Sequence, residues 1–214
     1  MTGAVPADID KAAFAGAPAP SGLSAEEIRE YEQLVFVYKH VFYAFYMASR
    51  PQTLTGLADS PVGLAAFLLD HDARSYELIA RAFDGHPGGL SRDDVLDNIT
   101  LFWLTNTAIS SARLYWENKI TYFSPKGVAI PAAVSAFPDE LYQCPRSWAE
   151  RVYPKLIHYN KLDKGGHFAA WEAAALFRRA ARGLQTTALV RAEWRRVRAR
   201  RLPMEHAATT ENSK

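Results

Sequence analysis

Apolar residues recur at helical spacing through the first half of the chain, after a lead-in that lacks such a pattern. Residues 2–23 are rich in Ala, Pro and Gly without sustained periodicity, which predicts an extended lead-in or linker. Ser24 and Glu27 have the spacing of a capping box, so a helix is expected to begin there. The helix is predicted to run to about Met47, because Pro51 disfavours helix at the residue before it. Aromatics crowd the second half of this helix, which indicates a buried or pocket-lining element.

Two further helix starts follow in the same half of the chain. Ser60 followed by Pro61 predicts a helix with proline at its first position. Ser91 and Asp94 form a second potential capping box, and apolar residues at helical spacing continue from there to about Glu117. The pattern is therefore helical throughout this region.

The pattern changes in the second half of the chain, where helices alternate with short apolar runs. Residues 128–137 are almost continuously apolar, as expected for a strand that is buried on both faces of a parallel sheet. A short helix over 145–152, a strand over 155–160 and a helix over 168–184 are predicted to follow. Strand–helix–strand–helix is typical of the final units of an α/β sheet. Two strands cannot form a covered parallel sheet, so the sequence describes part of a larger fold.

Composition adds few constraints to this outline. Of the 214 residues, 49% are hydrophobic and 22% charged, which is typical of a globular chain. The net charge is only +2, and residues 178–201 carry nine arginines against one acid. The single cysteine, Cys144, excludes an internal disulfide and fits a reducing compartment. No apolar run approaches membrane-spanning length and no secretory signal is recognisable, so we expect a cytoplasmic protein.

An acid and a histidine follow the two predicted strands. Asp139 and Glu140 come directly after the first strand, and His167 follows the second after Gly165-Gly166. Catalytic groups of open α/β sheets gather beyond the carboxyl ends of the strands, so these side chains can meet at one edge. A carboxylate bound to one imidazole nitrogen leaves the other as a base. The plainer interpretation, a surface acid and a helix-capping histidine, stays open on spacing alone.

Six short segments, in a consistent order along the chain, match one known family. They are Arg-Pro-Gln-Thr-Leu (50–54), Asp-Ser-Pro-Val-Gly-Leu-Ala-Ala (59–66), Asp-Asp-Val-Leu-Asp-Asn-Ile-Thr-Leu-Phe-Trp-Leu-Thr (93–105), Ser-Ser-Ala-Arg-Leu-Tyr-Trp-Glu-Asn (110–118), Pro-Arg-Ser-Trp-Ala-Glu (145–150) and Gly-Gly-His-Phe-Ala-Ala-Trp-Glu (165–172). Over roughly residues 4–172, the chain resembles the C-terminal half of a microsomal-type epoxide hydrolase of the α/β-hydrolase fold.

The resemblance implies an incomplete α/β-hydrolase fold. We expect a helical cap, or lid, followed by the last two strand–helix units of the core. The corresponding divisions are a linker (1–23), the cap domain (24–124), the C-terminal part of the core (125–184) and a basic, disordered tail (185–214). The tail resembles nothing in the family.

Residue roles are implied by the same resemblance. His167 corresponds to the base that activates water, and Glu140 to the acid that orients it, with Asp139 as the alternative acid. The resemblance predicts that a Glu140 oxygen lies within hydrogen-bond reach of a His167 ring nitrogen, about 2.6–3.2 Å.

Two tyrosines complete the implied site. Tyr115, in Arg-Leu-Tyr-Trp-Glu, corresponds to one of the two cap tyrosines that hydrogen-bond the epoxide oxygen. Tyr43 lies seven residues before the Arg-Pro-Gln-Thr segment and corresponds to the second, with Tyr46 as a nearby competitor. Phenols can stabilise a developing alkoxide because they remain protonated donors at neutral pH. The implied reaction converts a small hydrophobic epoxide to a vicinal diol without a metal or organic cofactor.

The nucleophile that this reaction needs is missing from the sequence. The aspartate that attacks the epoxide carbon should sit in a Gly-x-Asp-x-Gly turn between a strand and a helix. None of the twelve glycines belongs to such a turn, and the His-Gly-x-Pro segment of the family's oxyanion loop is also absent. We therefore interpret the chain as a truncated product or as one piece of a split gene, with a separately encoded N-terminal half as partner.

Other chemistry finds little support in the residues. Cys144 is a weak candidate nucleophile because it lies on a predicted loop without an elbow, and the six histidines lack metal-ligand spacing. No phosphate-binding loop occurs. Aromatics other than Trp194 do not interleave with the arginines of the tail, so we expect no nucleic-acid partner.

Two alternative functions remain open at this stage. The chain is either a non-catalytic remnant or split subunit that binds a hydrophobic ligand or a partner through the cap, or part of another hydrolase of the same fold, such as a dehalogenase or an esterase. The paired tyrosines argue against the second alternative. The DNA immediately upstream would distinguish a split enzyme from a remnant.

The missing nucleophile generates a first prediction. We expect the 214-residue chain alone not to hydrolyse styrene oxide, because without an attacking carboxylate no ester forms for His167 to resolve. Diol formation is measured for the purified chain and for a His167→Ala control. Turnover that disappears in the control would contradict the prediction.

Overall fold

The computed structural model describes residues 3–40, 42–70, 72–86, 89–118 and 122–172, together with residues 175, 178, 192 and 196. Its elements, in chain order, are α1 (Ala7–Phe14), α2 (Ala25–His40), α3 (Phe42–Ser49), the 3-10 helix η1 (Pro51–Ala58), α4 (Pro61–Leu69), α5 (Ala73–Phe83), α6 (Arg92–Thr105), α7 (Ala108–Glu117), β1 (Ala132–Ala136), α8 (Arg146–Val152), β2 (Leu156–Lys161) and α9 (Ala169–Glu172). Most of the predicted helix beyond residue 172 and of the predicted tail lies outside the described residues.

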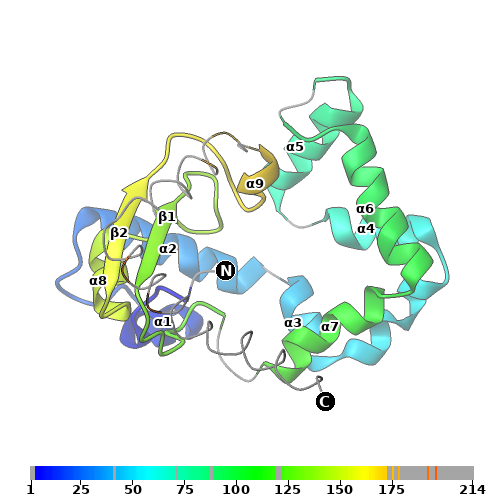
Figure 1. The fold of residues 1–214 in the computed structure, drawn as a ribbon. Helices are drawn as coiled ribbons and strands as arrows, with labels where there is room; N and C mark the ends of the chain where they lie inside the picture. Colours follow the sequence, from blue (N-terminus) through cyan, green and yellow to red (C-terminus); the bar gives the residue numbers. More distant parts are fainter. Residues whose placement is uncertain are drawn as a thin grey trace, which may run out of the picture.

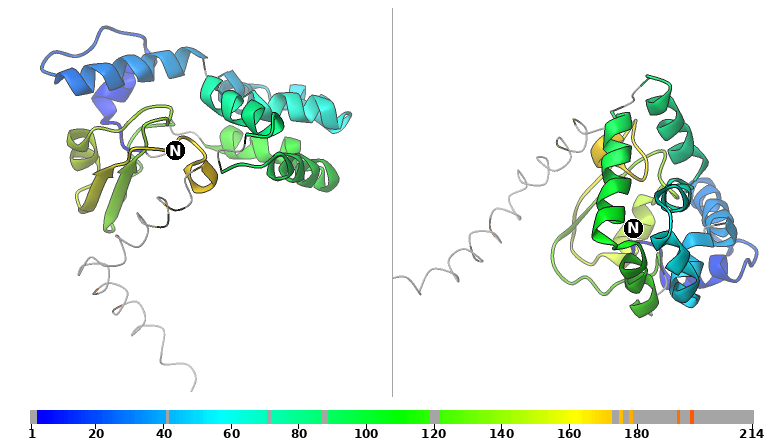
Figure 2. Two further views of the ribbon diagram at one scale, coloured as in Figure 1. Left: turned by 90° about the horizontal axis from the view of Figure 1, so that it is seen from above. Right: turned by 90° about the vertical axis from the view of Figure 1, so that its right-hand side faces the viewer.

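The elements form two groups (Figure 1). The two strands lie with α1, α2 and α8 on one side, and helices α3 to α7 lie on the other side. The view from above in Figure 2 separates the same two groups and places α9 between them. A site that draws side chains from both groups therefore has to form where they meet, beside α9.

The strands form the parallel pair that the sequence predicts. β1 pairs with β2, Ala136 opposite Lys161, and α8 lies between them in the chain. β1 is shorter than the predicted strand over 128–137. Pro131, immediately before β1, has no N–H to donate to the ladder, and Ile130 is exposed rather than buried.

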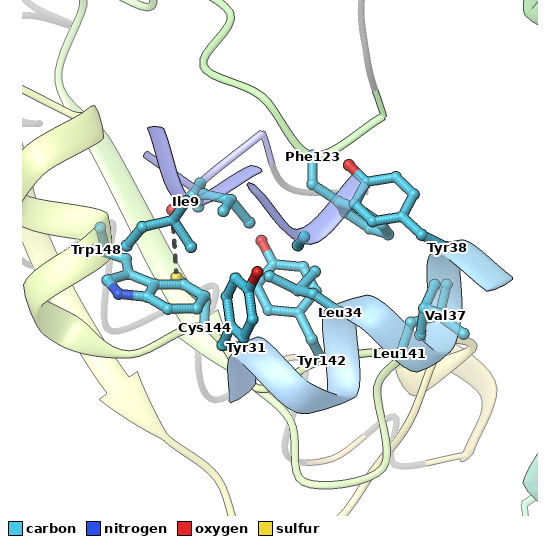
Figure 3. Packing of buried hydrophobic residues seen from close by; sticks show 14 of the residues in the cluster. Ile9, Tyr31, Leu34, Val37, Tyr38, Phe123, Leu141, Tyr142, Cys144 and Trp148 are labelled. Carbon is cyan, nitrogen blue, oxygen red and sulfur yellow. Dashed lines mark hydrogen bonds between the residues drawn. The ribbon is translucent and has the colours of Figure 1, made fainter. Parts of the chain in front are cut away.

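The largest hydrophobic core joins the sheet to the first two helices (Figure 3). Trp148 of α8 and Leu34 of α2 are completely buried in it. Ile9 of α1 packs into the same core, so the prediction of an extended linker over 2–23 was wrong for α1. Its apolar residues span barely two helical turns, which is too short a stretch for periodicity to be recognised.

Helix starts were predicted better than helix lengths. The Ser24–Glu27 and Ser91–Asp94 capping boxes are both present, and Ser60 accepts a hydrogen bond from the Gly63 N–H. Of the two long helices predicted from these starts, the first is described as α2 and α3, on either side of residue 41, and the second is divided in two. The second divides at Asn106, whose φ of 50° is left-handed, a conformation that asparagine tolerates better than most residues.

The different packing of α2 and α3 changes the expected cap. α2 packs with the sheet through Tyr31, Leu34, Val37 and Tyr38, whereas α3 packs with α7 and η1. The boundaries of the domains stay a prediction, but the helical group in Figure 1 begins at α3 rather than at residue 24. Among the described residues, no helix combines the length and the apolar character needed to cross a bilayer.

A buried carboxylate ties α1 to the rest of the core. Asp10 is 1% exposed and accepts hydrogen bonds from the Tyr38 hydroxyl and the Ser124 hydroxyl. Burial raises the pKa of Tyr38, and so do the hydrogen bond with Asp10 and the charge on Asp10. Tyr38 therefore keeps its proton and remains the donor.

This contact generates a stability prediction. We expect Asp10→Ala to lower the free energy of unfolding by about 2 kcal/mol, because it leaves buried hydroxyl groups without their acceptor. Urea denaturation followed by tryptophan fluorescence measures the change. The matched control is Asp8→Ala on the same helix, which removes an exposed ion pair with Arg151 and backbone contacts in the first turn, and is expected to lose less than about 1 kcal/mol. Equal losses in the two variants would show that Asp10 does not hold α1 in place.

Candidate functional site

The parallel pairing of the strands continues into the loops that follow them. After β1, the Asp139 N–H donates to the Gly165 carbonyl at 3.1 Å, and Asp139 and Gly166 form an isolated parallel bridge. The Leu162 N–H, just after β2, donates to the Ala136 carbonyl at 2.9 Å. These bonds fix the two loops against each other.

The glycines of the second loop make this close approach possible. Gly165 has a φ of +109°, and a Cβ there would lie 2.8 Å from the Phe137 ring. A Cβ at Gly166 would lie 2.8 Å from the Asp139 carbonyl oxygen. Any larger residue at these two positions would push the loops apart.

The fixed loops bring an acid and a base together. Nδ1–H of His167 donates to Oε1 of Glu140 at 2.7 Å, and both side chains are only partly exposed. The Leu141 N–H donates to the same carboxylate oxygen at 2.8 Å. Burial by itself would raise the pKa of Glu140. The His167 hydrogen bond, the His167 charge and the Leu141 N–H outweigh burial and hold that pKa below its ordinary value, so Glu140 is ionised at neutral pH.

Two tyrosines face each other in the helical group. Tyr43 of α3 and Tyr115 of α7 pack edge to face, with ring centroids 6.0 Å apart and planes at 85°. They flank a small core made of Met47, Leu54 and Ala112, which holds α3 against α7 and η1.

The environment of Tyr43 keeps its phenol protonated. Burial raises the pKa of Tyr43, and the neighbouring Tyr115 phenol, a hydrogen bond with Tyr115 and the charge on Glu140 raise it further. A phenol with a raised pKa remains a hydrogen-bond donor throughout the neutral range. The Glu140 contribution also indicates that the tyrosine pair and the Glu140–His167 pair are close enough to interact electrostatically.

All four side chains line one cavity of about 810 Å³. The sheet loops contribute Glu140 and His167, and α3 and α7 contribute Tyr43 and Tyr115. Apolar side chains form much of the remaining wall; they include Met47, Phe67, Leu68, Phe102, Leu114, Phe137, Phe168 and Trp171. The cavity thus places two phenol donors and a carboxylate–imidazole pair around a mainly apolar space.

The residues named as alternatives in the sequence do not line the cavity of about 810 Å³. Asp139 and Tyr46 both line a neighbouring hollow of about 900 Å³, which Tyr43 and Glu140 also line, and neither is among the described residues that line the first cavity. Tyr46 is also largely exposed. The placement therefore favours Glu140 over Asp139 and Tyr43 over Tyr46.

Cys144 has the properties of a packing residue. Its side chain is 4% exposed, and burial, followed by the charge on Glu30, raises the pKa of the thiol to about 12. Its thiol donates to the Ala4 carbonyl, the dashed contact in Figure 3. A thiol in this state is a poor nucleophile at neutral pH.

Sequence reasoning missed several residues of the cavity wall. Asn98 of α6 and Ser135 of β1 are polar groups in a mainly apolar wall, and the Ser135 hydroxyl donates to the Asn160 side-chain oxygen at 2.8 Å. No spacing pattern marks either residue. Glu172, which lies outside this cavity but within the quoted 165–172 segment, was also given no role. Among the described residues, no cluster of three or more His, Cys, Asp or Glu side chains could hold a metal ion.

Comparison with known proteins gives a consistent family signal. No family model matches the chain. Over 160 residues, or 72% of this chain, it is 47% identical to a putative epoxide hydrolase of Stigmatella aurantiaca. Over 162 residues, or 67% of the chain, it is 37% identical to epoxide hydrolase 1 of Sus scrofa. The chain spans only 35% of the length of each of these relatives.

A solved structure agrees with the sequence comparison. The juvenile hormone epoxide hydrolase of the silkworm Bombyx mori superposes with a TM-score of 0.62 at 26% identity, covering 90% of this chain and 47% of that protein. The small parallel sheet and the helical group therefore form part of an α/β-hydrolase fold.

The lowered pKa of Glu140 generates a pH prediction. A carboxyl group whose pKa is lower in the folded state than in the unfolded state stabilises the fold above the unfolded pKa, and this contribution is lost as the pH falls through the folded pKa. We expect Glu140→Gln to lower the free energy of unfolding by an amount on the order of 1 kcal/mol near neutral pH, because it replaces a charged acceptor with a neutral one.

The difference between the native chain and this variant should shrink as the pH drops below the ordinary carboxyl range of about 4.3. Urea denaturation at several pH values between about 3 and 7 measures it. Glu150→Gln, which alters an exposed ion pair with Arg146, is the control. A Glu140→Gln difference that is independent of pH would contradict the electrostatic role.

Proposed function

Because the chain belongs to the epoxide hydrolase family of the α/β-hydrolase fold, we propose that the complete protein hydrolyses epoxides to vicinal diols through an ester intermediate. The observation that carries the proposal is the 2.7 Å hydrogen bond between His167 and Glu140 at the edge of the cavity that Tyr43 and Tyr115 also line. This chain supplies the base, the orienting acid and two phenol donors. The attacking carboxylate comes from the part of the relatives that this chain does not cover.

Ring opening is the first chemical step. A carboxylate oxygen attacks one epoxide carbon, the carbon–oxygen bond of the ring breaks, and the epoxide oxygen leaves as an alkoxide. The Tyr43 and Tyr115 hydroxyls donate hydrogen bonds to that oxygen and protonate it as charge develops. The raised pKa of Tyr43 suits this role, since the phenol is fully protonated when the epoxide binds.

Hydrolysis of the ester is the second step. Nδ1–H of His167 is held by Glu140, so Nε2 takes a proton from the attacking water. Hydroxide adds to the ester carbonyl and the ester bond breaks; the proton of the new carboxyl group passes to the leaving alkoxide, which completes the diol and restores the carboxylate. The imidazolium returns its proton to the phenolate that ring opening left. The ionised Glu140 stabilises the imidazolium that forms in this step.

The cavity favours a small hydrophobic epoxide as substrate. Its wall is largely aliphatic and aromatic, and its volume of about 810 Å³ lies in the range of ordinary small-molecule sites. The reaction requires no metal or organic cofactor, because the carboxylate, the phenols and the imidazole supply every proton transfer and the nucleophile.

The source and location of the complete protein are part of the same proposal. The relatives carry the remaining fold in the same polypeptide, so an N-terminal extension of this chain is the favoured source, with a separately encoded N-terminal half as the alternative. The buried, unpaired thiol of Cys144 fits a reducing compartment, and we propose the cytoplasm.

A completed protein tests the proposed mechanism. The chain is joined to the part of the Stigmatella aurantiaca relative that it does not cover, and diol formation is measured. In this protein, His167→Gln should trap the ester, because ring opening continues while hydrolysis slows by about 10²–10⁴-fold. Mass spectrometry should then show a protein heavier by the mass of one epoxide.

The tyrosine variants test the first step separately. Tyr43→Phe combined with Tyr115→Phe should slow ester formation by about 10²-fold or more, because the leaving oxygen loses its donors. Tyr46→Phe, which removes a phenol outside the cavity, should leave the rate unchanged. If the completed protein folds but consumes no epoxide, and the unaltered relative does consume it, the result would favour the interpretation of this chain as a non-catalytic remnant. If the protein forms covalent adducts only when it is given an ester or a haloalkane, the result would favour another hydrolase of this fold.

A further inference from the structure

One carboxylate binds the backbone on both sides of His167. Oε2 of Glu172 accepts a hydrogen bond from the Gly166 N–H at 2.7 Å, and Oε1 accepts one from the Phe168 N–H at 2.9 Å. Glu172 lies in α9, and these two amides precede the first residue of that helix. The carboxylate therefore spans the loop and closes it into a ring around His167.

The other side of the loop is held by different contacts. Gly165 and Gly166 meet Asp139 through a backbone hydrogen bond and a parallel bridge. A Cβ at Gly166 would lie 2.8 Å from the Asp139 carbonyl oxygen and 3.1 Å from Oε2 of Glu172. Gly166 thus lies between Asp139 and Glu172, with no room for a side chain.

Glu172 acts from outside the large cavity. It is absent from the described residues that line the cavity of the four candidate catalytic side chains. It lines instead a hollow of about 210 Å³ between this loop and α5, together with His167 and Asp139. Its hydrogen bonds to the amides on both sides of His167 connect it to the cavity through the position of His167.

We propose that Glu172 is a positioning residue that holds the His167 ring at the distance and angle needed to donate to Glu140. The proposal rests on the proposed function for its catalytic consequence, whereas its geometric part concerns this chain alone. Because the amides of Gly166 and Phe168 are held, the Cα of His167 between them is held as well. The imidazole side chain therefore extends from a fixed point. A displacement of about 1 Å at a general base can reduce a rate by about 10²-fold.

The carboxylate is suited to this task because it has two acceptor oxygens and no donor. Glutamine at this position would keep one acceptor but would point an NH₂ group at the second amide. Aspartate is one methylene shorter and could not reach both amides. Replacing Glu172 by Ala should therefore disturb the loop most, and replacing it by Gln or Asp should disturb the loop less.

The geometric part is tested by NMR on the 15N-labelled chain. In Glu172→Ala, hydrogen exchange of the Gly166 and Phe168 amides should become about tenfold faster, because both lose their acceptor. The His167 Nδ1–H resonance should move or broaden as its bond to Glu140 weakens. Glu27→Ala is the matched control, since Glu27 also accepts a backbone N–H at a helix start, at 2.8 Å, but far along the chain from His167.

The catalytic part is tested in the completed protein. Glu172→Gln should lower kcat by about 10- to 100-fold and lower KM with it, so that kcat/KM stays nearly unchanged, and the ester should accumulate as it does when His167 is replaced. Ester formation itself should be unchanged, which separates a positioning role from general destabilisation.

The NMR measurements and the kinetic measurements test the two parts of the proposal separately. An unchanged Nδ1–H resonance and unchanged amide exchange in both Glu172→Ala and Glu172→Gln would overturn the positioning role, whatever the activity. Altered NMR signals in a completed protein that never forms an ester would instead contradict the proposed function and leave the geometric role in place.

Discussion

The parallel pairing of β1 and β2 is the constraint on which the candidate site depends. The pairing continues past both strands through the hydrogen bond from Asp139 to Gly165, so the loops that carry Glu140 and His167 are fixed by backbone contacts before their side chains meet. Two glycines permit this approach because a Cβ at either one would meet Phe137 or Asp139. The 2.7 Å contact between Glu140 and His167 is a consequence of this backbone arrangement.

The site also depends on the way the chain divides between two groups of elements. α2 belongs to the core of the sheet and α3 to the helical group, so the chain passes from one group to the other between these two helices. Tyr43 lies just after that division and Tyr115 on the helix packed against it. Burial among apolar helices raises the pKa of Tyr43, while hydrogen bonds at the loop lower the pKa of Glu140. One cavity therefore holds a protonated donor and an ionised acceptor at the same pH.

Short patterns in the sequence were sufficient to predict several features of the structure. The Ser24–Glu27 and Ser91–Asp94 capping boxes are present, because a capping box depends on two residues three apart and on little else. The strand–helix–strand order after residue 131 is confirmed, since apolar runs and turn residues alternate there. Chemistry at the candidate site was identified by family resemblance together with the placement of Glu140 and His167 after consecutive strands. Their catalytic roles stay a prediction.

The sequence by itself thus determined the helix starts, the parallel unit and the family, all of which depend on short stretches of chain. Only the tertiary structure decided what depends on contacts between distant stretches. α1 has too few residues for a recognisable period, and its burial follows from Asp10 meeting Tyr38 and Ser124. Glu140 lines the cavity with His167 and Asp139 does not, a difference between neighbouring residues that only the pairing of the two loops decides. The two amides held by Glu172 likewise become visible only once the loop has closed, because a carboxylate's partners depend on the fold around it.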